Sequence, residues 1–390
     1  MSKKRIAVIG KGTAGSQAAA HFNRFFPDDE IVWYFDSNKP VQSVGEGSTL
    51  ELPRNLYNNI GFFNSDLKKV NGNFKTSIYK ENWGSLGNKF FHDFPPPQTS
   101  YHFSATELQD YVHEYLKDKV KIIDQNVNPK EVDADFILNA SGKPDSFDDY
   151  YISEYIPVNA AHVVQCPWNY PRFDYTLTMA RKHGWVFGIP LGNRCSIGYI
   201  YNKDINSVED LQEEMHEIFE EYDLSPAEGA NNLSFNNYCK KENFEMSGRI
   251  ASSGNSSFFL EPLEATSIGT MDFIQRLAFD VWNGTKKYTN ANDEYLRFMH
   301  ETELVLMLHY AAGLPFDTAF WREANKKGLD KIKNSAQDHS FKEMYGVARK
   351  HKEMRFAPQD YPPYGPWWSG SFVQNLHSLD LFDTIDQILS

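Results

Sequence analysis

The stretch RIAVIGKGTAG, from Arg5 to Gly15, decides the fold of the amino-terminal part of this chain. Its first half, Arg5–Ile9, is a short apolar run that predicts a buried parallel strand, and its second half has the spacing Gly-x-Gly-x-x-Gly. Apolar side chains then recur at helical spacing over 13–25, and a second apolar run, Ile31–Phe35, follows. This order of strand, glycine turn, helix and strand predicts the βαβ opening of a Rossmann-type α/β fold.

Each glycine of the motif has its own role in binding a dinucleotide. Gly10 permits the tight turn, Gly12 lets a pyrophosphate approach the backbone, and Gly15 lets the helix pack closely on the strand. The N–H groups at the helix start attract phosphates, and an acidic residue after the second strand binds ribose hydroxyls. A glycine-rich turn in an ordinary α/β domain would explain the glycines but not the acidic Asp36 at the end of the second strand. The motif alone does not distinguish binding of NAD from binding of FAD. The predicted nucleotide-binding residues are Gly10, Gly12, Thr13, Ala14, Gly15 and Asp36.

Pattern changes along the chain suggest how it is organised. The βαβ opening covers 5–36, and short β-rich runs over about 150–203 predict an antiparallel sheet inserted beside the nucleotide-binding part. After Met271 the chain is predicted to be largely helical. We therefore expect a core over 1–285 and a carboxy-terminal helical region over 286–390.

Composition excludes several classes of function. A net charge of −13 argues against binding nucleic acid or an anionic membrane surface, since both need clustered Lys and Arg. No run approaches the roughly 18 apolar residues of a membrane span, and the first ten residues lead directly into a strand, which leaves no room for a signal peptide. Three scattered cysteines fit a reducing cytoplasm, and twelve histidines without ligand spacing predict no metal site. We expect a cytoplasmic protein.

Three further segments share a resemblance that none of them carries alone. They are GWVFGIP at Gly184–Pro190, FLEPLEATSIG at Phe259–Gly269, and FKTSI at Phe74–Ile78 with Asn82-Trp83 after it. Together they resemble the signatures of flavin-dependent halogenases of the tryptophan-halogenase type. The resemblance implies a Rossmann-type FAD-binding fold like that of flavin monooxygenases, with an inserted antiparallel sheet and a helical substrate-side region at the carboxy terminus.

The resemblance extends to segments that contact the flavin in that family. VGEGS at Val44–Ser48 is similar to the family's Val-Gly-Glu segment, and DFILNASG at Asp135–Gly142 and the pair Gly254-Asn255 are similar to its later flavin-contacting elements. GWVFGIP matches the family's Gly-Trp-x-Trp-x-Ile-Pro except at Phe187, and its rings would keep organic substrate away from the flavin. The resemblance therefore adds Gly45, Glu46, Ser48, Trp185, Ile189, Gly254 and Asn255 to the cofactor-binding residues.

The same family supplies roles for a glutamate and a halide site. In FLEPLEATSIG, Glu264 takes the position of the catalytic glutamate, while Ala265 and Ser267 replace the family's serine and glycine. The family holds its halide on backbone N–H groups, which here belong to Thr266 and Ser267. We expect this segment to lead into a helix starting near Met271, whose N-terminus favours an anion.

The remaining predicted site residues lie between 74 and 94. Lys75 matches the lysine that hydrogen-bonds hypohalous acid, or forms a haloamine from it, in the family. A lysine suits this role if it is partly desolvated near a carboxylate, which would be Glu264. His92 and Phe94 resemble a His-x-Phe element that lines the substrate pocket, although a structural histidine is an equal alternative.

The implied activity is halogenation of electron-rich aromatic or heteroaromatic substrates. FAD as FADH2, oxygen and a halide ion (chloride, bromide or iodide) would form hypohalous acid, with FADH2 supplied by a separate flavin reductase. We also expect a homo-oligomer, and the short chain suggests a compact, phage-encoded member of the family. Two alternatives stay open: a flavin-dependent aromatic hydroxylase, and a non-enzymatic FAD-binding protein with a vestigial catalytic pair.

Overall fold

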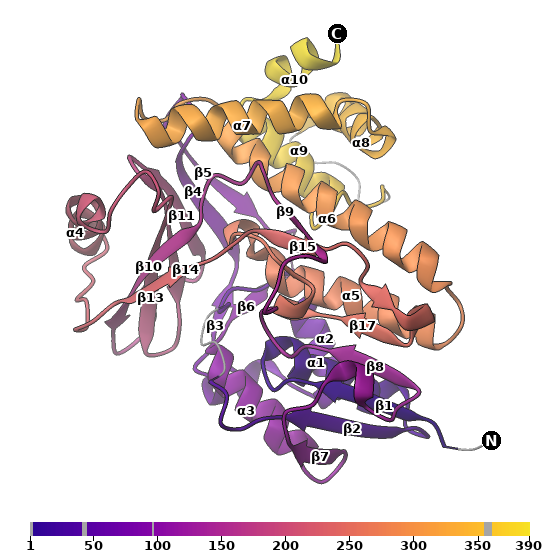
Figure 1. Ribbon diagram of the computed structural model, residues 1–390. Coiled ribbons are helices and arrows are strands. Elements are labelled where there is room, and N and C mark those ends of the chain that lie inside the picture. The colour runs from indigo at the N-terminus through magenta and orange to yellow at the C-terminus, as the bar shows by residue number, and fades with distance from the viewer. Residues whose placement is uncertain (1–2, 41–44, 96, 355–360) are drawn as a thin grey trace. The chain divides into compact units, whose positions relative to one another are not determined.

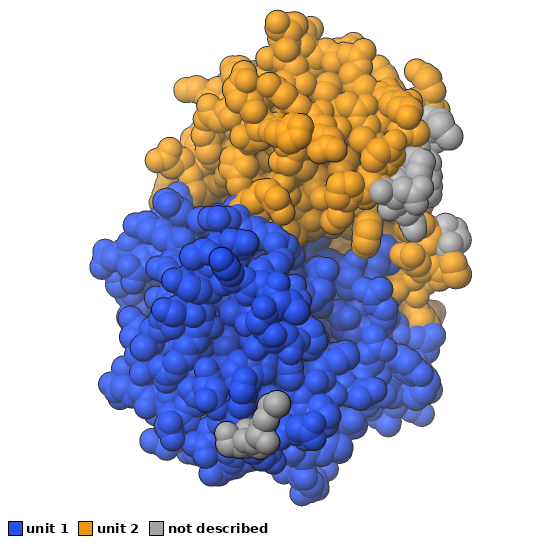
Figure 2. Space-filling model, turned by 90° about the vertical axis from the view of Figure 1, so that its right-hand side faces the viewer, with its two compact units in different colours: residues 1–73, 100–152, 238–296 blue, residues 74–99, 153–237, 297–390 orange. Residues whose placement is uncertain are grey.

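The computed structural model describes residues 3–40, 45–95, 97–354 and 361–390, and the chain forms two compact units, coloured separately in Figure 2. The units interleave along the chain. Unit 1 comprises Met1–Asn73, Ser100–Ile152 and Tyr238–Leu296. Unit 2 comprises Phe74–Thr99, Ser153–Asn237 and Arg297–Ser390.

Unit 1 is built on a six-stranded sheet in the order β16-β17-β8-β1-β2-β7 (Figure 1). All neighbouring strands are parallel except β16 and β17, which are antiparallel. The first two strands cover the predicted runs, with Ile9 of β1 opposite Tyr34 of β2, so the Rossmann-type prediction is confirmed. The strands are β1 (Arg5–Ile9), β2 (Glu30–Phe35), β7 (Lys121–Asp124), β8 (Phe136–Asn139), β16 (Phe244–Glu245) and β17 (Ile250–Ser252).

Helices and a small second sheet complete unit 1. Helix α1 packs against α2, α3 and α5, and Ala18 and Phe22 of α1 are fully buried. A three-stranded antiparallel sheet has the order β18-β15-β9. The helices are α1 (Thr13–Phe25), α2 (Glu51–Ile60), α3 (Ala105–Leu116) and α5 (Thr266–Trp282), with shorter 3-10 turns at η1 (Asn64–Val70), η2 (Pro129–Glu131), η4 (Met246–Gly248), η5 (Gly254–Ser256) and η6 (Leu263–Ala265). The remaining strands are β6 (Ser100–His102), β9 (Tyr150–Ile152), β15 (Tyr238–Lys240) and β18 (Phe258–Phe259), and β3 (Asn73–Lys75) carries the chain into unit 2.

Unit 2 contains the predicted inserted sheet, which is larger than the sequence suggested. Its seven strands have the order β14-β10-β13-β12-β11-β4-β5, antiparallel except for the parallel pair β11 and β4. The hairpin of β4 and β5 comes from 77–93, far upstream of the predicted segment. The strands are β4 (Ser77–Trp83), β5 (Asn88–Asp93), β10 (Ala160–Pro167), β11 (Thr176–Arg181), β12 (Gly184–Pro190), β13 (Arg194–Tyr201) and β14 (Asn231–Ser234).

The carboxy-terminal third is helical, as predicted. The last two helices, α9 and α10, are separated at Asp380, which adopts a left-handed φ of 54° between them. Helix α6 begins in unit 1 and continues in unit 2. The helices are α6 (Tyr288–Ala311), α7 (Ala319–Ser335), α8 (His339–Lys350), α9 (Ser369–Ser378) and α10 (Phe382–Leu389), with a 3-10 turn η7 (Lys352–Met354).

One face of the seven-stranded sheet packs under helix α4 (Gln212–Glu221), which follows the 3-10 turn η3 (Glu209–Leu211). The helix contributes Met215 and Ile218 to a buried apolar cluster that also contains Cys166 of β10 and Cys195 of β13. These two thiols belong to directly opposite residues of neighbouring strands, and both are fully buried. Burial raises the pKa of Cys166 to about 11.

The two units group the chain differently from the predicted division into 1–285 and 286–390. In the structure the inserted sheet belongs with Arg297–Ser390 in unit 2, whereas Tyr238–Leu296 returns to unit 1. A helical region on the substrate side stays a prediction. Within the described ranges, no helix is both long and apolar enough to cross a membrane, and no group of three or more His, Cys, Asp or Glu is arranged to hold a metal ion.

A partly buried histidine on α1, His21, makes the stability of unit 1 sensitive to acid. Burial lowers the pKa of His21 from 6.5 to about 4, and its Nε2 finds no hydrogen-bond partner among the residues that the structure describes. The ring lies 4.7 Å from that of Phe25 and 5.9 Å from that of Phe279. Because the folded pKa is below the unfolded one, the stabilisation is complete above the unfolded pKa and is lost as pH falls toward the folded pKa.

We expect the wild-type protein to lose about 2 kcal/mol more unfolding free energy than His21→Gln between about pH 7 and about pH 5. Glutamine does not titrate, so the variant lacks this contribution. Urea unfolding followed by tryptophan fluorescence measures the difference. His216→Gln is the control, because the His216 side chain is 74% exposed. Equal acid sensitivity of wild type and His21→Gln would contradict the prediction.

Candidate active site

The glycine turn of unit 1 has no room for side chains. A Cβ added at Gly10, whose φ is 110°, would lie 2.0 Å from the carbonyl oxygen of Ala140. A Cβ at Gly15 would lie 2.0 Å from the carbonyl oxygen of Gly10. The turn is held by Trp33, whose Nε1–H donates to that same Gly10 oxygen over 2.8 Å. Strand, turn and helix therefore pack so closely here that Gly10 and Gly15 admit no side chain.

Two polar residues flank this turn at the same end of the sheet. Asp36 follows β2, and its Oδ1 accepts the backbone N–H of Asn38 (3.0 Å) and that residue's side-chain amide (3.2 Å). Thr13, the first residue of α1, accepts a hydrogen bond from Gln109 through its Oγ1 (3.1 Å). Asp36 thus closes a local turn beside the glycine motif, in the position that a ribose-binding carboxylate occupies.

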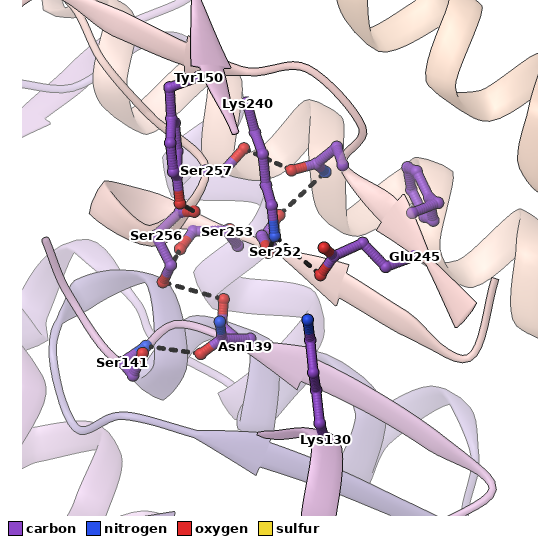
Figure 3. Close-up of polar contacts among 12 residues, drawn as sticks. Lys130, Asn139, Ser141, Tyr150, Lys240, Glu245, Ser252, Ser253, Ser256 and Ser257 are labelled. Carbon is purple, nitrogen blue, oxygen red and sulfur yellow. Dashed lines mark hydrogen bonds and ion pairs between the residues drawn. The ribbon is translucent and has the colours of Figure 1, made fainter. Parts of the chain in front are cut away.

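The Gly254-Asn255 loop packs onto the first turn of α1. A Cβ at Gly254, whose φ is 60°, would lie 2.8 Å from the Cβ of Ala14. The loop is tied to the end of β8, because the carbonyl oxygen of Asn139 accepts from the N–H of Ser253 (2.8 Å) and the hydroxyl of Ser256 (3.2 Å), the latter drawn in Figure 3. The structure therefore brings this loop and the glycine turn together at one edge of the sheet.

A buried polar network lies behind the loop. In Figure 3 the Lys240 side chain runs past Ser257 to Glu245 and Ser252, with Nζ distances of 2.9 Å to Glu245 Oε2 and 3.1 Å to Ser252 Oγ. The Ser257 hydroxyl donates to Asn243 Oδ1 over 2.7 Å. Because Lys240 is 7% exposed, removing one partner of its ion pair would leave a buried charge. The network gives the loop a rigid support.

The segment at 45–49 is pinned to β6. Val44, part of the quoted motif, lies outside the described residues. The Ser48 hydroxyl donates to the carbonyl oxygen of Tyr101 (2.5 Å), and the carbonyl oxygen of Glu46 accepts the N–H of Phe103 (3.0 Å). Gly45 has a φ of 90°, which favours glycine. The fully buried Ser48 hydroxyl thus anchors this segment to the chain beside it, and the flavin contacts of Gly45, Glu46 and Ser48 stay a prediction.

The segment around Glu264 is strained. Glu264 and Ala265 both adopt left-handed conformations, with φ of 66° and 52°, and Glu264 is 8% exposed. Helix α5 begins directly after them at Thr266, five residues before the start that we predicted near Met271. That prediction was wrong because the helix starts from left-handed Ala265 rather than from a recognisable capping residue. Two consecutive strained residues cost free energy and are typical of functional sites.

The helix start lies beside the 45–49 segment. A Cβ at Gly269 would lie 3.3 Å from the methyl carbon of Thr49. The N–H groups of Thr266 and Ser267, the predicted halide ligands, therefore belong to the first turn of α5, where N–H groups have no partner inside the helix. Unit 1 brings this turn and the predicted flavin-contacting segment of 45–49 together.

In unit 2, three predicted residues lie close to one another. Lys75 ends β3 and is 2% exposed, and its Nζ lies 5.6 Å from the centre of the Phe94 ring. His92 of β5 is buried and pairs in register with Ile78 of β4. The rings of His92 and Phe94 are 6.3 Å apart. Glu264 belongs to unit 1, so its pairing with Lys75 stays a prediction.

Strand β12 separates its side chains between two faces. Trp185, Phe187 and Ile189 alternate onto one face, while Val186 belongs to the core cluster under α4. The Phe187 ring lies against Gly198 of β13, where an added Cβ would meet the ring at 2.2 Å. Trp185 is 1% exposed, and its ring lies 6.2 Å from that of Trp83. Two of the quoted motifs, GWVFGIP and the Asn82-Trp83 pair, therefore meet in unit 2.

Sequence reasoning missed another buried lysine of unit 2, Lys80, and its partners. Lys80 of β4 is fully buried, and its Nζ contacts His309 of α6 and Asn375 of α9. The one available signal was a charged residue in an otherwise buried position of an alternating strand. Its partners could not be found from spacing, because they lie more than two hundred residues along the chain.

Comparison with known proteins gives a consistent result. The family model described as tryptophan halogenase matches residues 5–137 and 105–362. The 7-chloro-L-tryptophan 6-halogenase KtzR of Kutzneria sp. (strain 744) is 26% identical over 185 residues, 45% of this chain and 34% of that protein. The tryptophan 6-halogenase SttH of Streptomyces toxytricini is 23% identical over 270 residues, 59% of this chain and 49% of that protein. The chain thus spans about a third of the length of KtzR and about half of the length of SttH.

A solved structure extends the likeness in fold to nearly the whole chain. The tryptophan halogenase from Shewanella frigidimarina NCIMB 400 superposes with a TM-score of 0.78 at 16% identity, covering 99% of this chain and 93% of that one. At 16% identity this likeness shows the fold alone. The match to the family model covers most of the sequence, and it does not favour the hydroxylase alternative. The chain belongs to the tryptophan halogenase family.

Proposed function

We propose that the protein is a flavin-dependent halogenase, which uses FADH2, oxygen and chloride, bromide or iodide to halogenate electron-rich aromatic substrates. The observation that carries the proposal is the burial of Lys75 against Phe94. Lysine is rarely buried without a special reason, and here it stands in the family's lysine motif. Family membership and the strained Glu264 segment support the same reading.

The residues of unit 1 fit FAD. The N–H groups at the start of α1 would hold the pyrophosphate, Asp36 would bind the ribose, and the segments at Gly45–Ser48 and Gly254-Asn255 would contact the flavin. When bound and reduced, FAD supplies the activation of oxygen that oxidises halide to hypohalous acid. The chain itself supplies binding, orientation and protection of this chemistry.

The start of α5 would hold the halide. N–H groups of Thr266 and Ser267 carry partial positive charge at the helix N-terminus, which attracts an anion. Since backbone donors do not depend on the side chain, the replacements at Ala265 and Ser267 leave these N–H groups in place. We infer that the replacements act on the size of the site and so on the choice of halide.

Lys75 and Glu264 are the proposed catalytic residues. The Lys75 amine would hydrogen-bond hypohalous acid, or form a haloamine from it, and present the halogen to the substrate. Glu264 would orient this group and take the ring proton after the halogen adds. Trp185 and Ile189 would keep the substrate from the flavin, while His92 and Phe94 would form a wall of the substrate pocket. We also propose a separate flavin reductase as partner, a homo-oligomeric state and a cytoplasmic location.

The test is a halide-dependent change of mass. The purified protein is incubated under air with FAD, NADH and a general flavin reductase, and each halide is tried against phenols, indoles and anilines. The expected product carries a halogen in place of hydrogen and depends on the halide supplied. Addition of one oxygen atom, whatever the halide, would assign the protein to the hydroxylases, and flavin binding without any product would make it a non-enzymatic binder.

A further inference from the structure

A chain of hydrogen bonds in unit 2 connects β4, β5, α6 and α9. These four elements are labelled in Figure 1. It starts at the carbonyl oxygen of Val305, which lies 3.1 Å from His309 Nδ1. His309 Nε2 lies 2.7 Å from Lys80 Nζ, and Lys80 Nζ lies 2.6 Å from Asn375 Oδ1. Lys80, His309 and Asn375 are all fully buried.

The direction of the first bonds is fixed by chemistry. A carbonyl oxygen only accepts, so His309 carries its proton on Nδ1 and offers a lone pair at Nε2. Lys80 therefore donates to His309, and it also donates to the amide oxygen of Asn375. The amide nitrogen of Asn375 donates to the carbonyl oxygen of Ser371 over 2.9 Å, which confirms the orientation of the amide group.

The same amide nitrogen faces His92. Its distance to His92 Nδ1 is 3.4 Å, and because an amide nitrogen only donates, Nδ1 must offer a lone pair. The proton of the neutral ring is then on Nε2, which lies 2.9 Å from the Ser371 hydroxyl oxygen. Lys80 and His309 are the titratable groups that this network connects to His92. The Lys80 amine donates to Asn375 Oδ1 whether it is charged or neutral, so the orientation of the Asn375 amide is the same in both cases.

We propose that Asn375, oriented by Lys80, is a positioning residue that holds His92 as a neutral imidazole with its proton on Nε2. This inference rests on the proposed function, in which His92 borders the substrate. Both ring nitrogens are then engaged by α9, so His92 meets the substrate with its flat face. The Phe94 and Trp367 rings stand nearly perpendicular to it, at 80° and 82°.

Neutrality matters for the reaction because halogen addition makes the substrate ring cationic. An imidazolium at His92 would attract the neutral, electron-rich substrate through a cation–π interaction. It would repel the cationic intermediate that follows. A charged His92 should thus bind substrate well and turn it over slowly, whereas a merely damaged pocket would bind it poorly.

The test replaces the amide by a carboxylate. In Asn375→Asp the new carboxylate accepts from Lys80 and draws a proton onto His92 Nδ1, which charges the ring. We expect kcat to fall on the order of tenfold or more with KM unchanged or lower, while flavin binding and peroxide release persist. The matched control is Gln374→Glu, the same change one residue earlier on α9, where the amide donates to the carbonyl oxygen of Phe91 instead.

The state of His92 is read independently of turnover by 15N NMR of histidine-labelled protein, with His92→Gln identifying the signal. The expected wild-type spectrum shows a neutral ring protonated at Nε2, and Asn375→Asp shows an imidazolium. A wild-type signal from the other tautomer or a charged ring overturns the proposal, as does an unchanged kcat in Asn375→Asp. A protein with the expected tautomer but no halogenated product would instead overturn the proposed function.

Discussion

Lys75→Met is expected to lower formation of halogenated product on the order of 10³-fold or more, while oxygen is still consumed with FADH2 and appears as hydrogen peroxide. The proposed chemistry at the flavin does not need this amine, but delivery of the halogen to the ring does. Methionine is chosen because Lys75 is 2% exposed, and an unbranched apolar side chain of similar length fills the space that alanine would leave empty. Product is measured by mass spectrometry and peroxide by a coupled assay.

The matched control for this experiment is a lysine on the surface. Lys68 lies in η1 and is exposed, so Lys68→Met should change neither product nor peroxide. Product formation by Lys75→Met at the wild-type rate would remove Lys75 from the mechanism. Loss of peroxide together with product would show instead that the substitution damaged flavin binding.

Glu264→Gln is expected to lower product formation by roughly 10²-fold to 10⁴-fold, the usual contribution of a general acid or base. Glutamine has the same shape and tolerates the left-handed backbone about as well as glutamate, so the fold and the start of α5 should be preserved. A neutral amide, however, cannot take the ring proton. Single-turnover halogenation followed by quenching and mass spectrometry isolates this step.

Glu242→Gln is the corresponding control, because Glu242 is exposed and lies in the same unit. Circular dichroism and FAD titration should give the same result for wild type and both variants. Wild-type product formation by Glu264→Gln would show that the charge of Glu264 is not needed, and that the strain at Glu264 and Ala265 serves only the geometry of the helix start.

The nucleotide-binding half of the fold could be predicted because its signals are local. A buried strand, a turn that excludes Cβ atoms and a helix follow one another within 5–25, and each is determined by neighbours in sequence. The start of α5 was mispredicted for the converse reason. Its first residue follows left-handed Ala265, a conformation that alanine seldom adopts and that no local pattern indicates.

The candidate site was predicted in pieces rather than as a whole. Lys75, His92 and Phe94 come from one short stretch of sequence, where two neighbouring motifs indicate them. The bonds from Lys80 to His309 and Asn375 join residues 229 and 295 positions apart, and such contacts follow from tertiary packing alone. The join of β4 to β11 escaped prediction for the same reason, because parallel pairing of distant strands leaves no periodic signal.

Cys166 of β10 and Cys195 of β13, two free thiols on opposite residues of neighbouring strands, bear on how long such an enzyme would survive the oxidant that it makes. Electrophilic oxidants attack the thiolate rather than the thiol. With its pKa raised to about 11, Cys166 is a thiolate in only about one molecule in ten thousand near neutral pH. Hypohalous acid that escaped capture would therefore meet an unreactive sulfur. The sheet that carries Trp185 would thus shield the sulfurs of Cys166 and Cys195 from such an oxidant, because both are fully buried in it.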